Sequence, residues 1–101
     1  MYELIDEMVG AFSQSIIDEG EDGEDAAGYA FEAFTENAEM LEEIATLYNN
    51  FELTEEEFEE ELEDQRITLE TQLLALVVIQ KAMLQRAIDS ALNIFRQSVG
   101  L

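Results

Sequence analysis

Histidine, cysteine, proline and tryptophan are absent from this sequence, and the absences exclude whole classes of protein. Without cysteine there is no disulfide framework or thiolate metal site, and without histidine there is no imidazole zinc site or Ser/His or Cys/His nucleophile pair. Basic residues are also scarce, because Lys and Arg number 4 against 25 Asp and Glu, giving a net charge of −21 at pH 7. Direct nucleic-acid binding is excluded, since too few cations are present to neutralise phosphates.

The remaining composition predicts a single folded domain, residues 1–101, because 48% of the chain is apolar. The longest apolar run, residues 73–79, is far shorter than the roughly 20 residues that cross a bilayer, and anionic membranes repel so acidic a chain. Glu3, Asp6 and Glu7 stand where a secretory signal carries Lys or Arg. We therefore expect a protein that is neither secreted nor membrane-bound, in the cytoplasm or within a viral particle.

Charge divides this domain into two parts. Residues 1–65 contain 23 acidic residues and no basic one, whereas residues 66–101 contain all four basic residues and only two acids. The first part is predicted to hold two helices separated by a glycine- and acid-rich loop at 18–25. The second part is predicted to be the apolar half of a C-terminal helix.

Helical periodicity is present throughout the chain, and it predicts an all-α fold of three helices. Apolar residues recur at three- and four-residue steps over 2–17 and again over 26–49, where Asp25 is a candidate N-cap and the Asn49–Asn50 pair is expected to end the helix. The third helix is expected to begin with a capping box formed by Thr54 and Glu57.

The third helix is expected to run from 55 to 98, about 65 Å at roughly 1.5 Å per residue, because no helix breaker follows until Gly100. A break near Gln65–Arg66 is the alternative. The apolar residues of this expected helix form two seams along its length. Ile67 belongs to one seam and Leu69 to the other, and at about 100° of rotation per residue they lie about 200° apart around the helix axis. One chain of this size is expected to cover a single seam, so the other predicts a homo-oligomeric helical bundle or docking into a larger assembly.

The predicted interface for that association lies within residues 69–95. Its members are Leu69, Leu73, Leu74, Leu76, Val77, Leu84, Ile88, Leu92 and Phe95. The alternative is that the two shorter helices cover both seams within one chain.

A block of acids precedes the apolar half and forms a predicted acidic docking face. Its members are Glu56, Glu57, Glu59, Glu60, Glu61, Glu63 and Asp64. Three interpretations remain open: a solvated face that confers solubility, a docking surface for a basic protein, and an imitation of nucleic-acid phosphates. A saline habitat is a further explanation of the acidity, although it does not account for the confinement of the basic residues to one end.

Metal and enzyme chemistry have little support in this sequence, so no catalytic, cofactor-binding or metal residue is predicted. Carboxylate-bridged di-metal bundles use Glu-x-x-His pairs, which are absent here, leaving Glu70 and Glu39 as the acids closest to apolar residues. The acids of 18–25 do not reproduce a calcium-loop spacing.

The favoured interpretation is a non-enzymatic structural or assembly protein, for which a viral particle is one setting. It associates through its C-terminal helix and presents an acidic surface to solvent or to a basic partner. The first alternative is an acidic DNA mimic that inhibits a nucleic-acid-binding enzyme, since the composition resembles that of phage-encoded anti-restriction and anti-CRISPR proteins. The second is a carboxylate metal-binding helical bundle.

Overall fold

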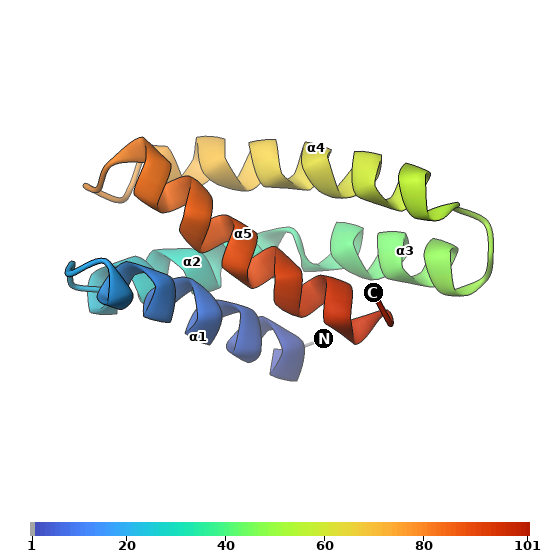
Figure 1. Ribbon diagram of the computed structural model, residues 1–101, viewed down its shortest axis with the longest axis horizontal. Helices are drawn as coiled ribbons and strands as arrows, with labels where there is room; N and C mark the ends of the chain where they lie inside the picture. The colour runs from blue at the N-terminus through green and yellow to red at the C-terminus, as the bar shows by residue number, and fades with distance from the viewer. Residues whose placement is uncertain (1) are drawn as a thin grey trace.

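Five α-helices make up the computed structural model, which describes residues 2–101, and there is no strand among them (Figure 1). In chain order the helices are α1 (Tyr2–Asp18), α2 (Glu24–Glu36), α3 (Ala38–Asn49), α4 (Glu55–Leu74) and α5 (Lys81–Ser98). The prediction of an all-α fold is confirmed. The prediction of three helices is wrong, because two of the expected helices are each divided in two.

The first division falls at Asn37, inside the helix expected over 26–49. The Asn37 side-chain amide donates one hydrogen bond to the carbonyl oxygen of Ala33, at 2.8 Å, and another to the side-chain oxygen of Gln72 on α4, at 3.1 Å. Asparagine competes with the helical backbone for hydrogen bonds in this way and is common where helices end. The contact with Gln72 also ties the α2–α3 junction to the last turn of α4.

The second division falls over residues 75–80, inside the helix expected over 55–98, and not at the alternative position near 65–66. Three consecutive β-branched residues, Val77, Val78 and Ile79, lower helix propensity there because branching at Cβ restricts χ1 in a helix. Gln80 is extended, with φ −64° and ψ 140°, and α5 begins at the next residue. The chain therefore folds back on itself, and no 65 Å rod exists.

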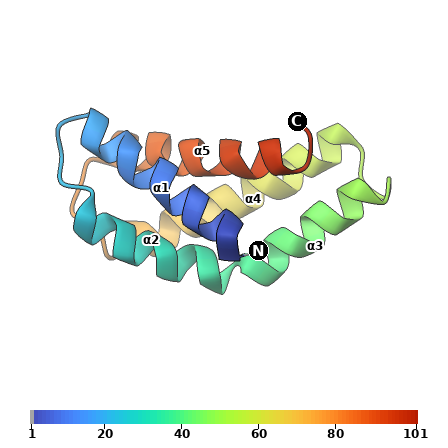
Figure 2. The same ribbon diagram turned by 90° about the horizontal axis from the view of Figure 1, so that it is seen from below.

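This fold-back places α5 in the middle of the bundle, packed against α1 on one side and α4 on the other (Figures 1 and 2). Two aromatic contacts mark the core: Phe12 meets Phe34 edge to face at 5.9 Å, and Phe58 stacks on Phe95 at 5.9 Å between ring centres. All five helices contribute buried apolar side chains, the largest being Phe12, Phe34, Phe58, Phe95, Ile5, Met8, Ile16, Leu41, Ile44, Leu62, Leu69 and Leu73.

The capping box predicted at the start of α4 is confirmed. The hydroxyl of Thr54 accepts a hydrogen bond from the backbone N–H of Glu57 at 3.1 Å, and the Glu57 carboxylate accepts one from the backbone N–H of Thr54 at 3.0 Å. Asp25, by contrast, is not the N-cap of the second helix. Gly23 occupies that position, and Asp25 lies in the first turn of α2.

Gly23 is the glycine that the packing requires, because the α1–α2 loop approaches α1 closely at this point. A Cβ atom at Gly23 would lie 2.8 Å from the backbone oxygen of Ser13 and 3.2 Å from a side-chain carbon of Ile17. Gly28, inside α2, has no neighbouring atom within 4 Å of an added Cβ. The two positions should therefore respond to the same substitution with opposite signs.

We expect Gly23→Ala to lower the free energy of unfolding by about 1–3 kcal/mol, because a backbone oxygen cannot move aside as a side chain can. Gly28→Ala should instead raise it by about 0.5–1 kcal/mol, the usual gain from alanine over glycine inside a helix. Urea unfolding of both variants, followed by circular dichroism, measures the two changes. Equal effects at both positions would contradict the close approach of the loop to α1.

Candidate partner-binding surfaces

Most of the predicted interface lies in the core of a single chain. Six of its nine residues are buried by contacts within that chain: Leu69, Leu73, Leu84, Ile88, Leu92 and Phe95. The expectation that one chain could cover only one seam is wrong, because the break at 75–80 lets the two halves of the helix turn their apolar faces separately toward the same core. These six residues offer no surface for association.

The other three predicted interface residues lie at or beside the bend between α4 and α5, and they stay at least partly accessible. Leu74 is 41% exposed and Leu76 is 47% exposed, while Val77 is half-buried against the core. Val78, which sequence reasoning missed, is fully exposed. The continuous apolar run 73–79 was the sequence feature that could have indicated this exposed connection. It predicts helix instead, because the apolar seams on either side of it continue through it at helical spacing.

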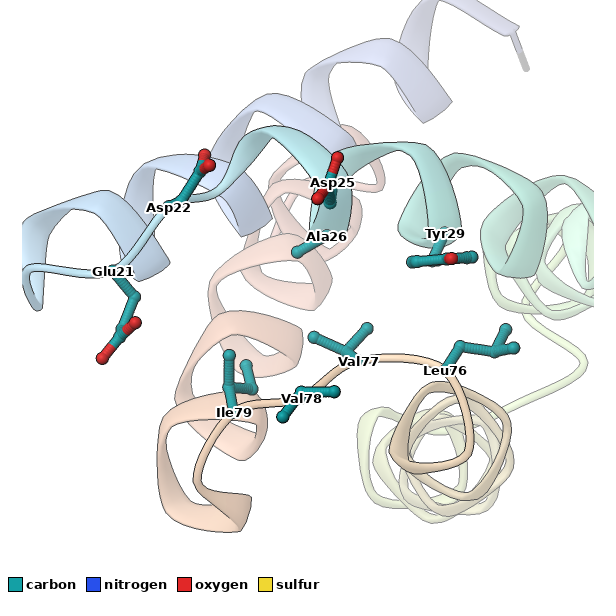
Figure 3. A pocket seen from close by; sticks show the side chains of 9 residues that line it. All are labelled: Glu21, Asp22, Asp25, Ala26, Tyr29, Leu76, Val77, Val78 and Ile79. Atoms are coloured by element: carbon teal, nitrogen blue, oxygen red, sulfur yellow. The ribbon is translucent and has the colours of Figure 1, made fainter.

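A groove of about 330 Å³, with both apolar and acidic lining residues, runs along this connection (Figure 3). Residues 76–79 form one wall, and Ala26 and Tyr29 on α2 face them from the other side. Three acids of the α1–α2 loop and the start of α2 complete the lining: Glu21, Asp22 and Asp25. The groove exists because the α1–α2 and α4–α5 connections lie at the same end of the molecule (Figures 1 and 2).

All four basic side chains of the protein are engaged in ion pairs with its own acids. Arg66 lies 3.0 Å from Glu63 on the same helix. The longer-range pairs are Arg96 with Glu59 at 2.9 Å, Lys81 with Glu70 at 3.9 Å, Arg66 with Asp89 at 3.9 Å, and Arg86 with Glu19. The hydrogen bonds that Arg66 donates to the Glu63 carboxylate raise the pKa of Arg66. Burial partly offsets this rise, and the negative charges of Glu63, Asp89 and Glu70 add to it.

The predicted acidic docking face lies along the first half of α4, and all its carboxylates except that of the half-buried Glu59 are well exposed. Glu59 and Glu63 are neutralised by arginines of the same chain. Within residues 2–101, no ion pair involves the other members, which are Glu56, Glu57, Glu60, Glu61 and Asp64. The face therefore carries a concentrated negative charge that the fold leaves uncompensated.

We expect the free energy of unfolding to rise by about 1 kcal/mol between 20 mM and 0.5 M NaCl, because salt screens the repulsion among the carboxylates. The ion pairs lose strength under the same conditions, but they involve only 4 cations against 25 acids. Urea midpoints across a NaCl series measure the change, with KCl as a control for ion identity. A midpoint that falls with salt would show that the ion pairs outweigh the repulsion.

The two acids considered for a carboxylate metal site, Glu70 and Glu39, do not form one. The Glu70 carboxylate accepts a hydrogen bond from Gln85 at 3.0 Å and lies 3.6 Å from Arg66. Cations of the protein therefore occupy the space around it, and Glu39 is exposed on α3. Across the described part of the chain, no group of three acids is placed to hold a metal ion.

One exposed aromatic residue was also missed by sequence reasoning. Phe51, in the turn between α3 and α4, is 95% exposed and has a positive φ of 62°. This conformation costs a non-glycine residue about 1–2 kcal/mol, and its side chain gains almost no packing in return. The turn lies at the opposite end of the molecule from the groove (Figure 1).

Comparison of the chain with protein-family models, with characterised proteins and with solved structures finds no match. Over residues 2–101, none of the helices combines the length and apolarity that a membrane crossing requires. The molecule offers two candidate binding surfaces, the acidic face of α4 and the groove between residues 76–79 and α2.

Proposed function

We propose that this protein is a non-enzymatic assembly or adaptor protein that binds a basic protein through the acidic face of α4. The observation that supports the proposal is the complete use of the basic side chains within the chain, while five carboxylates of that face have no ion-pair partner among residues 2–101. A surface of one sign attracts a partner of the opposite sign and accelerates its association.

A basic partner is favoured over a second copy of the chain. Each copy carries a net charge of −21, and its four cations are already engaged by its own acids. Most of the apolar seam residues that suggested a homo-oligomer lie in the core. Two copies would therefore bring like charges together without a large apolar surface to compensate.

We expect the isolated chain to be a monomer of 11.5 kDa at micromolar concentration and moderate salt. Multi-angle light scattering coupled to size exclusion measures this mass directly. A second run at 0.5 M NaCl removes most of the repulsion between copies and serves as a control. A stable dimer or larger oligomer in both runs would contradict the preference for a basic partner.

The proposal is tested by removing four negative charges from the acidic face and comparing the result with four removed elsewhere. The test variant is E56Q/E57Q/E60Q/E61Q, in which glutamine at 57 still completes the capping box. The control variant, on exposed positions of α1 and α2, is E3Q/D6N/E7Q/E32Q. Both are immobilised, and bound proteins from an extract of the source cells are identified by mass spectrometry.

We expect the unmodified protein and the control to capture the same basic proteins, and the test variant to lose them, with affinity for the purified partner lower by about tenfold or more. Equal loss in both variants would mean that only net charge matters, and undiminished capture by the test variant would remove the acidic face from the interaction. Either result overturns the proposal.

Competition by duplex DNA separates the adaptor from the DNA mimic within the same experiment. A mimic occupies the nucleic-acid site of its target, so DNA added at constant ionic strength would displace it. An adaptor bound elsewhere on a basic protein would stay in place. Displacement by DNA would therefore replace the adaptor proposal with the mimic.

A further inference from the structure

We propose that the groove between residues 76–79 and α2 binds an apolar side chain of the partner, presented on a segment that is rich in Lys or Arg. This inference rests on the proposed function, because it names the chemistry of the same basic partner at a second point of contact. It differs in its location, at the end of the molecule where the α1–α2 and α4–α5 connections meet.

The apolar part of the groove supports an apolar occupant. Leu76 and Val78 are exposed although they lie in a connection, where polar residues are usual. Tyr29, 39% exposed, faces residues 76–79 across the groove (Figure 3). These side chains stay in contact with water in the isolated chain, so covering them with an apolar side chain gains the free energy of burial that the fold leaves unused.

The charge around the groove supports a basic segment as the carrier of that side chain. The charged residues of its lining are Glu21, Asp22 and Asp25, all exposed acids. In Figure 3 the Glu21 carboxylate extends from the α1–α2 loop on the side of the groove nearer Ile79, while the carboxylates of Asp22, in the same loop, and Asp25, in the first turn of α2, point away from residues 76–79 at the rim. Lys or Arg residues flanking the apolar anchor would meet these carboxylates, and a cation can also approach the face of the Tyr29 ring.

The same charges argue against a second copy of this chain as the occupant. A partner copy docked through its own groove would place its three carboxylates against the first three, and like charges placed together at an interface are costly. A partner of the opposite charge converts that cost into a gain. The groove therefore selects for a basic segment by repelling acidic ones.

The test uses random twelve-residue peptides displayed on phage, selected on the purified full-length protein. We expect the enriched peptides to contain Leu, Ile, Phe or Met next to Lys or Arg. The most enriched peptide is then synthesised with a fluorescent label, and its affinity is measured by anisotropy. Failure to enrich such peptides would overturn the inference.

Two variants locate the bound peptide. L76S/V78S removes exposed apolar side chains from the groove, and M40S/F51S removes two exposed apolar side chains elsewhere. Because all four side chains are at least 46% exposed, neither variant should disturb the fold. We expect the first to weaken peptide binding by about tenfold or more and the second to leave it unchanged. Equal weakening, or none, would overturn the inference.

Backbone NMR shifts and the acidic-face variant separate this inference from the proposed function. With the peptide bound, we expect amide shifts to change over 21–29 and 76–79, and E56Q/E57Q/E60Q/E61Q to bind the peptide as the unmodified protein does. If the shift changes were confined to α4 and binding were lost in that variant, the inference about the groove would be overturned, while the proposed binding of a basic partner by the acidic face would be supported. Formation of a dimer in place of peptide binding would overturn the choice of a basic partner.

Discussion

Leu84→Glu is expected to unfold the protein, whereas Leu76→Glu is expected to leave it folded. Leu84 is fully buried on α5, so a carboxylate there would lie in the core with no cation beside it, at a cost of several kcal/mol. Such a cost is comparable to the total stability of a domain of this size, about 5–15 kcal/mol. Leu76 is 47% exposed in the α4–α5 connection, where a carboxylate can stay hydrated.

Far-ultraviolet circular dichroism and urea unfolding measure both variants, and the unmodified protein in the same buffer is the reference. The pair also distinguishes the five-helix fold from the long helix that the sequence suggested. On a continuous rod, both leucines would lie on seams available for association, and both glutamates would leave helicity intact. A folded Leu84→Glu protein would therefore contradict the burial of α5.

The second large effect is expected for Phe58→Ala, which should lower the free energy of unfolding by about 3–5 kcal/mol. Phe58 is fully buried and links two parts of the core. Its ring stacks on that of Phe95 on α5 at 5.9 Å and contacts Tyr48 on α3 at 4.8 Å. Alanine would leave a cavity where three helices meet.

Phe51→Ala is the matched control, because it makes the same chemical change at a side chain that is 95% exposed. Its effect on the free energy of unfolding should lie within about 0.5 kcal/mol, as is usual at surface positions. Thermal and urea unfolding of the two variants give the comparison. Similar losses at both positions would show that the α3–α4 turn is packed more tightly than the structure indicates.

Several local features of the fold could be predicted from the sequence because they depend on residues close together in the chain. The capping box of Thr54 and Glu57 closes over three residues, so the start of α4 was placed correctly. The apolar residues of α1 recur at helical spacing, and Ile5, Met8 and Phe12 are buried as that spacing requires.

The candidate site was predictable only in part. The acidic face of α4 follows from composition and helical spacing, and its carboxylates, apart from that of the half-buried Glu59, are exposed as a charged helix surface should be. The groove was not predictable, because Tyr29 and Val77 are 48 positions apart in the sequence and meet only after two connections are brought to the same end of the molecule. No pattern within a short stretch of the sequence indicates that these two residues come together.

Sequence alone determined the helical class, the start of α4 and the excess of negative charge, since each depends on composition or on neighbours within a few positions. Tertiary structure decided where the predicted C-terminal helix ends. Residues 55–98 have the periodicity of one continuous helix, but two opposite apolar seams on a rod leave one in water. Breaking the helix over 75–80 buries Leu69 and Leu73 together with Leu84 and Ile88 in one core. Burial of apolar surface outweighed the few backbone hydrogen bonds that the break removes, and it left the connection exposed.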